Sequence, residues 1–563
     1  MRQPPCNSKA DSGNPPPTSD DKYNTAKARR DSHVNAVLNS TSPKKVVVAG
    51  PGTGKTHLFK KVLAGKPNSL TLTFINALVD DLSVDLAGMS RVRTLHGFAR
   101  DLLKALRKKA HVNIFPKLAE LIRDDLLILK GLEVDFPRAF HTRDDENEHF
   151  SFYKARRKYY DDSYGYSDVV FAAVKSLEAR SDTIPSYDQV LVDEFQDFNL
   201  LEVSLINLLA ERSPVLVAGD DDQALYDFKH ADPKHIRDLH RGSEFESFTL
   251  PLCSRCPRVV IAATNDVVES ATKNGRLLSR IPKAYEYFDS EAKDAISDRY
   301  PRLTRKTLHA PQFPWYISKQ LGDLLDGLRQ RFSVLIIAPY KKQAKSIAIA
   351  LTKMGFQAVD FVDRDDREIT LRDGLERLLI DPKSNLGWRI IAGFRLPKDD
   401  VKALLQKTEN ATPPLIIDLV PPTLKKETKQ ALTALRRLRD GETPDADQLS
   451  LLKAYDVDPL AVGLNDLSRE LSADPSAGVR PGLRRLPIKV TTIQSSKGLA
   501  ADVVFITHLD DVFWITKEGM TDRDVCNFLV ALTRAKTKVF LLSSQKVAPT
   551  FVNWIKPERI EET

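Results

Sequence analysis

The segment Ala49–Thr56, which reads AGPGTGKT, decides the fold. It follows the apolar run Val46–Ala49, which is typical of a buried parallel strand, and it precedes helical periodicity from His57 to Leu63. This order of strand, glycine-rich turn and helix fits the P-loop, although Ala49 replaces the usual first glycine. A glycine turn that only caps a strand is the alternative, and the flanking elements argue against it.

The small residues of this loop let backbone N–H groups point inward around phosphates at a helix N-terminus. Lys55 can then reach the β and γ oxygens, and the Thr56 hydroxyl can bind magnesium. The expected contacts to a nucleoside triphosphate are Ala49, Gly50, Pro51, Gly52, Thr53, Gly54, Lys55, Thr56 and His57.

Two adjacent carboxylates, Asp193 and Glu194, follow a second apolar run, Gln189–Val192. Ligands bind at the carboxyl ends of strands in parallel sheets. Asp193 is placed to hold magnesium through water, and Glu194 to orient the attacking water and accept its proton. An acidic pair after a strand is more often a solvated loop, but the upstream P-loop favours the catalytic interpretation.

Similar apolar runs recur along the chain, and most are followed by helical periodicity. They are Leu70–Phe74, Gln189–Val192, Val215–Ala218, Val334–Ala338, Val490–Ile493, Val503–Thr507 and Val539–Leu542. Strands alternating with helices predict an α/β fold with parallel sheets covered on both faces, and the number of strands suits two sheets better than one. Residues 101–164 and 396–486 carry no strand signal, so we expect two helical insertions.

The composition excludes several classes of protein. Of 563 residues, 42% are hydrophobic, and no apolar run is long enough to span a bilayer, so we expect a cytoplasmic protein without membrane contact. Four cysteines are too few for a disulfide framework. Cys253 and Cys256 form a CxxC, for which a metal or redox role is a minor alternative. The net charge of +8 fits a nucleic-acid partner without requiring one.

Four further segments, together with the P-loop and the acidic pair, occur in the order typical of one family. They are Thr94–Phe98, Gly219–Tyr226, Thr492–Leu499 and Val530–Lys536. From about His33 to Ser543 the chain resembles the UvrD/Rep-like superfamily 1A DNA helicases. The resemblance implies two RecA-like P-loop domains, called 1A and 2A, with ATP and Mg²⁺ bound between them and DNA across the top.

The resemblance also implies domain boundaries. We expect domain 1A over residues 33–100 and 165–250, its helical insertion 1B over 101–164, domain 2A over 251–395 and 487–545, and a reduced helical insertion 2B over 396–486. The proline-rich residues 1–32 should form a disordered tail, because they cannot bury enough apolar surface to offset ordering. Residues 546–563 should form a C-terminal tail with no room for a nuclease domain.

By the same resemblance, Gln223 senses the γ-phosphate, and Arg255 and Arg534 are arginine fingers. A planar guanidinium can meet the transferring phosphoryl group with two donors. A surface salt bridge is the alternative for each arginine, and it is stronger for Arg255, whose setting Cys253–Arg255 departs from the family's Asn-Tyr-Arg.

The family positions that touch single-stranded DNA are matched by Phe74, Asn76, His96, Phe228, Lys229, Thr492 and Gln494. Phe228 stands where a tryptophan usually stacks on a base, and an aromatic platform there tolerates any sequence. Lys229 offers a phosphate contact. Phe74 could instead belong to the core. The basic and aromatic run Lys154–Tyr160 is better explained as a solvated helix face than as a DNA groove.

The departures from the family gather on the nucleoside side of the site. The adenine-reading glutamine is absent, with His33 near its place, and His57, Ser254 and Ala500 replace a basic residue, a stacking tyrosine and a ribose-binding glutamate. Because phosphate contacts are the same for every nucleoside triphosphate, we hypothesise that catalysis survives while base discrimination is loosened.

We therefore expect an ATP-dependent translocase or helicase that moves 3′ to 5′ on single-stranded DNA, or on DNA with a 3′ single-stranded tail. The short 2B insertion favours movement along the strand over processive strand separation. The alternative is an ATP-switched, DNA-binding regulatory subunit of a partner nuclease. A degenerate scaffold is the least favoured interpretation, since Lys55, Asp193 and Glu194 are all present.

Overall fold

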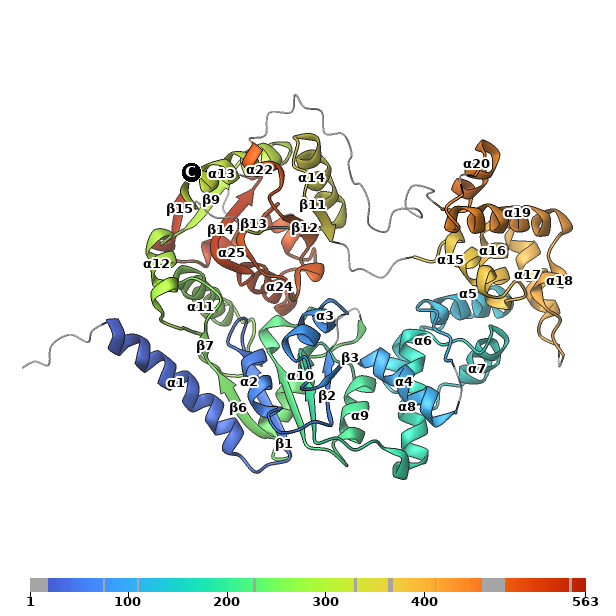
Figure 1. The fold of residues 1–563 in the computed structure, drawn as a ribbon, viewed down its shortest axis with the longest axis horizontal. Helices are drawn as coiled ribbons and strands as arrows, with labels where there is room; N and C mark the ends of the chain where they lie inside the picture. Colours follow the sequence, from blue (N-terminus) through green and yellow to red (C-terminus); the bar gives the residue numbers. More distant parts are fainter. Residues whose placement is uncertain are drawn as a thin grey trace, which may run out of the picture.

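The computed structural model describes residues 19–73, 76–108, 111–225, 229–328, 332–362, 368–410, 412–442, 444–457, 481–545 and 549–563. Two parallel sheets, each flanked by helices, lie next to each other, and a helical lobe lies to one side of them (Figure 1). The predicted α/β fold with two such sheets is confirmed. None of the described helices is long and apolar enough to cross a membrane.

The N-terminal sheet is parallel and has the strand order β3-β2-β4-β5-β1-β6. Its strands are β1 (Lys44–Ala49), β2 (Ser69–Thr73), β3 (Arg91–Thr94), β4 (Gln189–Val192), β5 (Val215–Gly219) and β6 (Glu246–Leu250). Strands β2, β4 and β5 are buried along their whole length, as expected for a sheet covered on both faces. The carboxyl ends of β1, β5 and β4 therefore meet at one edge.

Helices cover both faces of this sheet. One face packs against α1 (Ser19–Asn39), α2 (Lys55–Val62) and α3 (Asn76–Asp85). The other packs against α4 (Leu95–Leu106), α8 (Tyr166–Ala179), α9 (Leu200–Leu209) and α10 (Lys234–Arg241). Successive side chains of β1 point to opposite faces of the sheet. Val46 packs against the layer of α4, α8, α9 and α10, and Val47 against the layer of α1, α2 and α3.

The C-terminal sheet is also parallel, with the order β11-β12-β10-β13-β14-β9-β15. Its strands are β9 (Leu303–Thr307), β10 (Val334–Ala338), β11 (Val359–Val362), β12 (Ile488–Thr492), β13 (Ala501–Ile506), β14 (Ala535–Ser543) and β15 (Ile560–Glu562). One face packs against α11 (Arg258–Lys273), α23 (Asp511–Trp514), α24 (Asp522–Leu532) and α25 (Thr550–Asn553). The other packs against α13 (Phe313–Leu328), α14 (Lys341–Lys353) and α22 (Pro481–Arg484).

The connection between the two sheets holds a small parallel pair of strands, β7 (Leu252–Cys253) and β8 (Glu286–Tyr287). Helix α12 (Glu291–Arg299) follows β8. This segment lies against the P-loop edge of the first sheet, because Ser254 N donates to Gly52 O over 2.9 Å.

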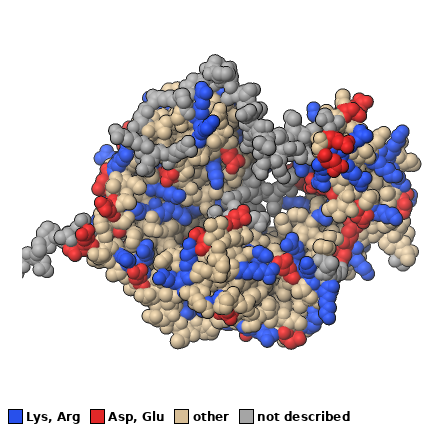
Figure 2. All heavy atoms as spheres, in the orientation of Figure 1, with Lys and Arg blue, Asp and Glu red and all other residues tan. Residues whose placement is uncertain are grey.

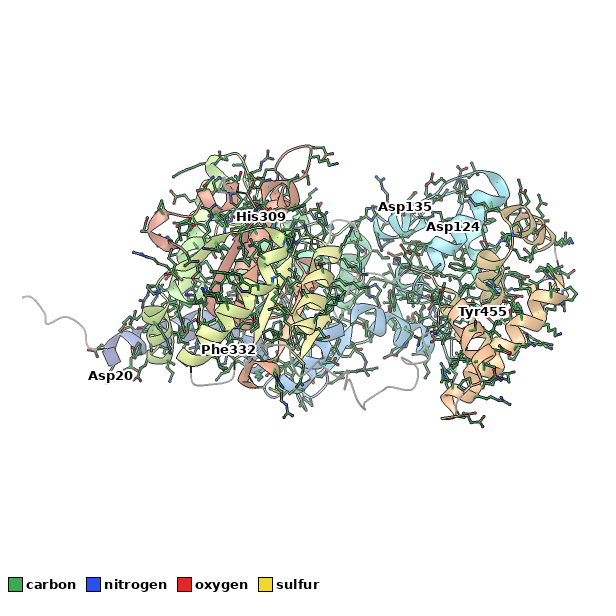
Figure 3. The ribbon with its side chains drawn as sticks, turned by 90° about the horizontal axis from the view of Figure 1, so that it is seen from above. Asp20, Asp124, Asp135, His309, Phe332 and Tyr455 are labelled. Atoms are coloured by element: carbon green, nitrogen blue, oxygen red, sulfur yellow. The ribbon has the colours of Figure 1, made fainter. Side chains whose placement is uncertain are left out.

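The helical lobe is built from two stretches far apart in sequence. The first contributes α5 (Leu118–Lys130), α6 (Phe136–His141) and α7 (Phe150–Tyr159); the second contributes α15 (Leu371–Ile380), α16 (Asn385–Arg395), α17 (Lys398–Lys407), α18 (Ile416–Leu419), α19 (Pro422–Arg439) and α20 (Ala446–Ala454). The two stretches share one core, and a buried ion pair joins Arg389 Nε to Asp125 Oδ1 over 2.7 Å. Seen from above, Asp124 and Tyr455 lie together at the lobe end, far from His309 and Phe332 (Figure 3).

Three predicted boundaries were wrong. The tail was expected to extend to residue 32, but α1 begins at Ser19, because Ala26, Val34 and Val37 are buried and Arg29 pairs with Glu286. These tertiary contacts stabilise a helix that its polar sequence does not predict.

The second insertion was expected to begin at residue 396, but α15 and α16 already belong to the lobe, since their apolar faces pack there and not on the sheet. At the C-terminus, the predicted tail contains α25 and the edge strand β15, which pairs in parallel with β9. Backbone pairing of Ile560–Glu562 with β9, and packing of Ile560 against the C-terminal core, hold this short strand.

Candidate nucleotide site and nucleic-acid interface

The P-loop connects β1 to α2 in the conformation that its glycines permit. Gly52 and Gly54 have φ angles of +71° and +95°, in the left-handed region that favours glycine. A Cβ on Gly52 would also lie 2.3 Å from Cβ of Arg255, so no side chain fits there. The loop is thus shaped for backbone contacts, and it touches the segment that carries one predicted arginine finger.

Lys55 lies in the first turn of α2 and contacts both predicted catalytic carboxylates. Its Nζ is 2.6 Å from Glu194 Oε1 and 3.3 Å from Asp193 Oδ1. Thr56 follows it in the same turn and is half-buried. The structure therefore brings together the lysine and the two carboxylates that were predicted to act on phosphate and magnesium, with Thr56 next to the lysine in the chain.

The two carboxylates differ in their ease of ionisation. Burial raises the pKa of Asp193, against the opposing charge of Lys55. Burial also acts to raise the pKa of Glu194, but the charges of Lys55 and Lys497 outweigh it and hold that pKa well below its usual value. Glu194 is thus kept ionised, which is the form that can accept a proton.

Gln196 completes this part of the site, and the sequence reasoning did not identify it. Its Nε2 donates to Glu194 Oε2 over 2.7 Å, and its Oε1 accepts from Asp220 N over 3.0 Å. A side chain on Gly219 would collide with it, at 2.4 Å from Oε1. Gln196 therefore links the acidic pair after β4 to the loop after β5, and its position two residues beyond the pair was the available signal.

Gln223 lies where the two α/β units meet. Its Nε2 donates to Asp220 Oδ2 over 2.7 Å, and its Oε1 accepts from Arg534 Nη2 over 2.8 Å. Arg534 is buried, and burial together with the charge of Arg255 lowers its pKa to about 10, which still leaves it charged at neutral pH. The two predicted fingers are thus near each other and on the nucleotide side of the C-terminal unit.

Lys497 is a second residue that the prediction missed. Although only 1% exposed, it places Nζ 2.5 Å from Asp197 Oδ2, 2.7 Å from Gln223 O and 3.7 Å from Glu194 Oε2. It crosses from the C-terminal unit into the catalytic edge of the N-terminal one. Its place within Thr492–Leu499 was the only signal in the sequence.

The acidic run Asp220–Asp222 is neutralised by a lysine from the other unit. Lys283 Nζ lies 2.8, 2.5 and 2.9 Å from carboxylate oxygens of the three aspartates in turn. Arg280 pairs with Asp222 over 2.6 Å. Within the described residues this run is the only group of three potential metal ligands, and the lysine occupies its centre.

The nucleoside side differs from the phosphate side. Phe288 N donates to Cys253 O over 3.1 Å, which puts Phe288 across from Ser254, where the family has its stacking tyrosine. The guanidinium of Arg30 stacks on the Phe288 ring, with Cζ 4.5 Å from the ring centroid. Burial, followed by the charge of Arg30, lowers the pKa of nearby His57. An aromatic ring and a cation are thus present here, although on other residues than expected.

Of the predicted DNA contacts, Phe74 and Phe228 lie outside the described residues, and so does the side chain of Asn76. Asn76 itself begins α3, just after β2. His96 follows β3 and is half-buried, with Nε2 3.9 Å from Glu202 Oε1.

The remaining DNA candidates are Lys229, Thr492 and Gln494. Thr492 ends β12 and is buried, with Oγ1 accepting from Ser495 N over 3.4 Å, and Gln494 is half-buried. Lys229 O lies 3.5 Å from Asn199 Nδ2. On the face drawn in Figure 2, Lys and Arg are interspersed with Asp and Glu and form no single basic field.

Comparisons with known proteins agree with this arrangement. Residues 138–243 match the UvrD/REP helicase N-terminal domain family. The chain is similar to an ATP-dependent helicase/nuclease subunit of Lactococcus lactis subsp. cremoris (strain SK11), with 27% identity over 211 residues, which are 35% of this chain and 17% of that protein. It is also similar to the protein of the same name from Streptococcus pyogenes serotype M49 (strain NZ131), with 36% identity over 95 residues, which are 16% of this chain and 8% of that protein. The alignments thus span a small part of these relatives.

Proposed function

We propose that this chain, a UvrD-like superfamily 1 protein, is a DNA-dependent nucleoside triphosphatase and DNA helicase that moves 3′ to 5′ along single-stranded DNA. The observation that carries the proposal is the path from Lys55 and Glu194 through Gln196 and Asp220 to Gln223 and Arg534. This path starts at the P-loop of one α/β unit and ends on an arginine of the other.

The chemistry follows from the groups along this path. The P-loop N–H groups and Lys55 would bind the phosphates of ATP, and Thr56 and Asp193 are the oxygen ligands that would hold Mg²⁺. Bound magnesium neutralises charge on the phosphates. The ionised Glu194, held by Gln196, orients water for in-line attack and accepts its proton.

Hydrolysis couples to movement because the charge stabilisers belong to both units. Arg534 belongs to the C-terminal unit and donates to Gln223 of the N-terminal unit. It would therefore reach the γ-phosphate only when the two units are close. Loss of the phosphate removes the charge that attracts both guanidiniums. Repeated closing and opening would move the DNA-binding positions at the carboxyl ends of β2 and β3 relative to those at the carboxyl end of β12.

Steady-state phosphate release, with and without a single-stranded oligonucleotide, tests this function. We expect DNA to stimulate release in the wild type, and Lys55→Ala and Glu194→Gln to abolish it. Unwinding of duplexes with 3′ and 5′ tails tests polarity, and the 3′-tailed duplex should be separated. An NTPase indifferent to DNA would contradict the proposal, and preferential unwinding from a 5′ tail would contradict the polarity.

A second candidate is an ATP-switched, DNA-binding protein that controls a partner nuclease. The two relatives carry the name helicase/nuclease subunit, and the two helical insertions of this chain are joined in one lobe. DNA-stimulated hydrolysis without movement along the strand would favour this candidate. A displacement assay, in which a translocating protein strips a tightly bound protein from the end of an oligonucleotide, distinguishes the two.

A further inference from the structure

Two cysteines enclose the arginine that approaches the P-loop. Cys253 ends β7, Cys256 precedes Pro257 and α11, and Ser254 and Arg255 lie between them. Both thiols are fully buried, and Cys256 N donates to Cys253 Sγ over 3.4 Å. The pair thus folds back on itself directly before the N-terminus of α11.

One hydroxyl connects both sulfurs to the P-loop. Tyr285 Oη lies 3.3 Å from Cys253 Sγ, 3.7 Å from Cys256 Sγ and 3.0 Å from the carbonyl oxygen of Pro51. Cys253 Sγ also lies 3.3 Å from the position that a Cβ on Gly52 would take. The thiols are therefore part of the contact between the P-loop and the segment before α11.

The two thiols differ in their readiness to ionise. Burial acts to raise the pKa of Cys253, but hydrogen bonds from the Cys256 thiol, the Cys256 N–H and Tyr285 outweigh it and lower that pKa to about 5. The hydrogen bond given to Cys253, together with burial, raises the pKa of Cys256 well above its usual value. Such a division into one thiolate and one thiol suits a nucleophile and its resolving partner.

A metal site does not account for the pair. A structural zinc ion needs four ligands, and in the described ranges no His, Asp or Glu joins these thiols in a group of three. Redox chemistry needs only the two sulfurs.

Both predicted arginine fingers are attached to this pair. Arg255 lies between the cysteines in sequence, and its Cβ touches the P-loop at Gly52. Cys256 Sγ lies 3.4 Å from the carbonyl oxygen of Thr533, so its single thiol proton is shared between this oxygen and the Cys253 sulfur. Thr533 directly precedes Arg534. The two sulfurs therefore flank Arg255 in sequence, and that of Cys256 also contacts the backbone directly before Arg534.

We propose that Cys253 and Cys256 form a reversible disulfide that switches the NTPase off by displacing Arg255 and Arg534 from the phosphate site. The proposal rests on the NTPase function proposed above. A disulfide brings two sulfurs to about 2.05 Å, so the backbone between the cysteines must tighten. Tightening strains the Ser254–Gly52 hydrogen bond, and loss of the Cys256 S–H removes the bond to Thr533.

The step balances with a small disulfide such as oxidised glutathione as the oxidant. Both thiols are buried in the reduced protein, so the first step takes place when the segment before α11 opens away from the P-loop and exposes Cys253. The Cys253 thiolate then attacks one sulfur of glutathione disulfide and releases one glutathione thiolate. Cys256, losing its proton, then attacks Cys253 in the mixed disulfide and releases the second. The two protein thiols are oxidised, one glutathione disulfide is reduced to two glutathiones, and excess thiol reverses the reaction.

The test equilibrates the full chain in buffers with a range of reduced-to-oxidised glutathione ratios. Differential alkylation and peptide mass measurement give the fraction of Cys253–Cys256 disulfide, and phosphate release in the presence of single-stranded DNA gives the activity. We expect both to change at the same ratio, with the oxidised form at least about 10-fold slower, because displaced charge stabilisers cost that much or more. Dithiothreitol should restore the rate.

Cys526 supplies the matched control, because it is buried in α24 and is not part of the CxxC. Cys526→Ser should keep the full redox response, whereas Cys253→Ser and Cys256→Ser should each lose it. Absence of the disulfide at every ratio would overturn the proposal, as would a disulfide that leaves the rate of an active enzyme unchanged. If the reduced enzyme hydrolyses no nucleotide, both the proposed function and the switching role are contradicted. The mass measurement still shows whether the two thiols form a disulfide.

Discussion

Arg534 donates a hydrogen bond from Nη2 to Oε1 of Gln223 over 2.8 Å, although the two residues belong to different α/β units. Gln223 is held at its other end by Asp220, and its backbone carbonyl accepts from Lys497. Gln223, in the loop after β5, therefore contacts both Arg534 and Lys497 of the C-terminal unit. Under the proposed function, a phosphate bound between the units would therefore act on both of them through this contact.

Arg534→Lys and Gln223→Ala should each lower kcat by about 100-fold or more, because a lysine lacks the planar fork and the alanine lacks the acceptor. Nucleotide affinity should change much less. Because the two groups act together, the double variant should lose little beyond the worse single one. Steady-state phosphate release gives kcat, and Arg258→Lys, an exposed arginine on α11, is the control that should behave as wild type. Fully additive losses would contradict a shared role.

Lys55→Ala and Glu194→Gln should fail at different steps. The alanine removes the cation that meets the phosphates, so binding of a fluorescent ATP analogue should weaken. The glutamine keeps the shape of the site but cannot accept a proton, so binding should persist while hydrolysis falls by about 100-fold or more. Lys60→Ala, on the exposed side of α2, is the control. Intact binding in Lys55→Ala would refute its phosphate role.

The fold could be predicted to a large extent, because parallel strands that are buried on both faces have continuous apolar sequences. The run Val334–Ala338 became β10 with the predicted bounds, and the run Val215–Ala218 became β5, which extends one residue further, to Gly219. Helix α1 could not be predicted, since its sequence is polar and its stability comes from buried Val34 and Val37 and from ion pairs with residues far along the chain.

The candidate site was predicted where motifs mark it and missed where only tertiary contacts build it. Lys55, Asp193 and Glu194 meet as expected, because their strands end at one edge of the sheet. Lys283 carries no sequence signal, since its partners precede it by about sixty positions and an isolated lysine in a loop usually faces solvent. A buried contact of this kind depends on how the two units pack.

Lys283→Met should destabilise the protein by about 3–5 kcal/mol, because it leaves three buried carboxylates with too little positive charge. Thermal unfolding measures the effect, and Lys273→Met, which removes an exposed ion pair with Glu269, should shift the midpoint only slightly. Added Ca²⁺ should restore part of the loss in Lys283→Met alone, because the carboxylate oxygens lie within 4.8 Å of one another. Equal midpoints for both variants would contradict the assignment.

Nucleotide selectivity should be weak. The phosphate contacts do not depend on the base, and the base side carries Ser254, His57 and a Phe288 ring covered by Arg30. DNA-stimulated hydrolysis of ATP, GTP and CTP should therefore give kcat/KM values within about 10-fold of each other, since the glutamine that reads adenine and the tyrosine that stacks on it in the family are replaced in this chain. A strong preference for ATP would show that other residues read adenine.

Asp168 predicts a pH dependence of stability that is separate from catalysis. It is buried in α8, and burial raises the pKa of its carboxyl to about 7. An aspartate in the unfolded chain has a pKa of about 3.9. Between these values the folded protein keeps a proton that the unfolded chain has released, so this group's contribution to stability falls as the pH rises from about 4 to about 7, by at most about 1.4 kcal/mol per pH unit.

Asp168→Asn removes this titration and keeps the size of the side chain. The unfolding midpoint of the variant relative to the wild type should therefore rise steadily from about pH 4 to about pH 7 and level off above that, where both states of the wild type are ionised. Asp124→Asn, at a half-exposed position of α5, is the control. Its unfolding midpoint relative to the wild type should not show this steady rise between about pH 4 and about pH 7. Parallel midpoints for Asp168→Asn and the wild type across this range would mean that Asp168 is ionised in the folded protein, and that a cation near it compensates the burial.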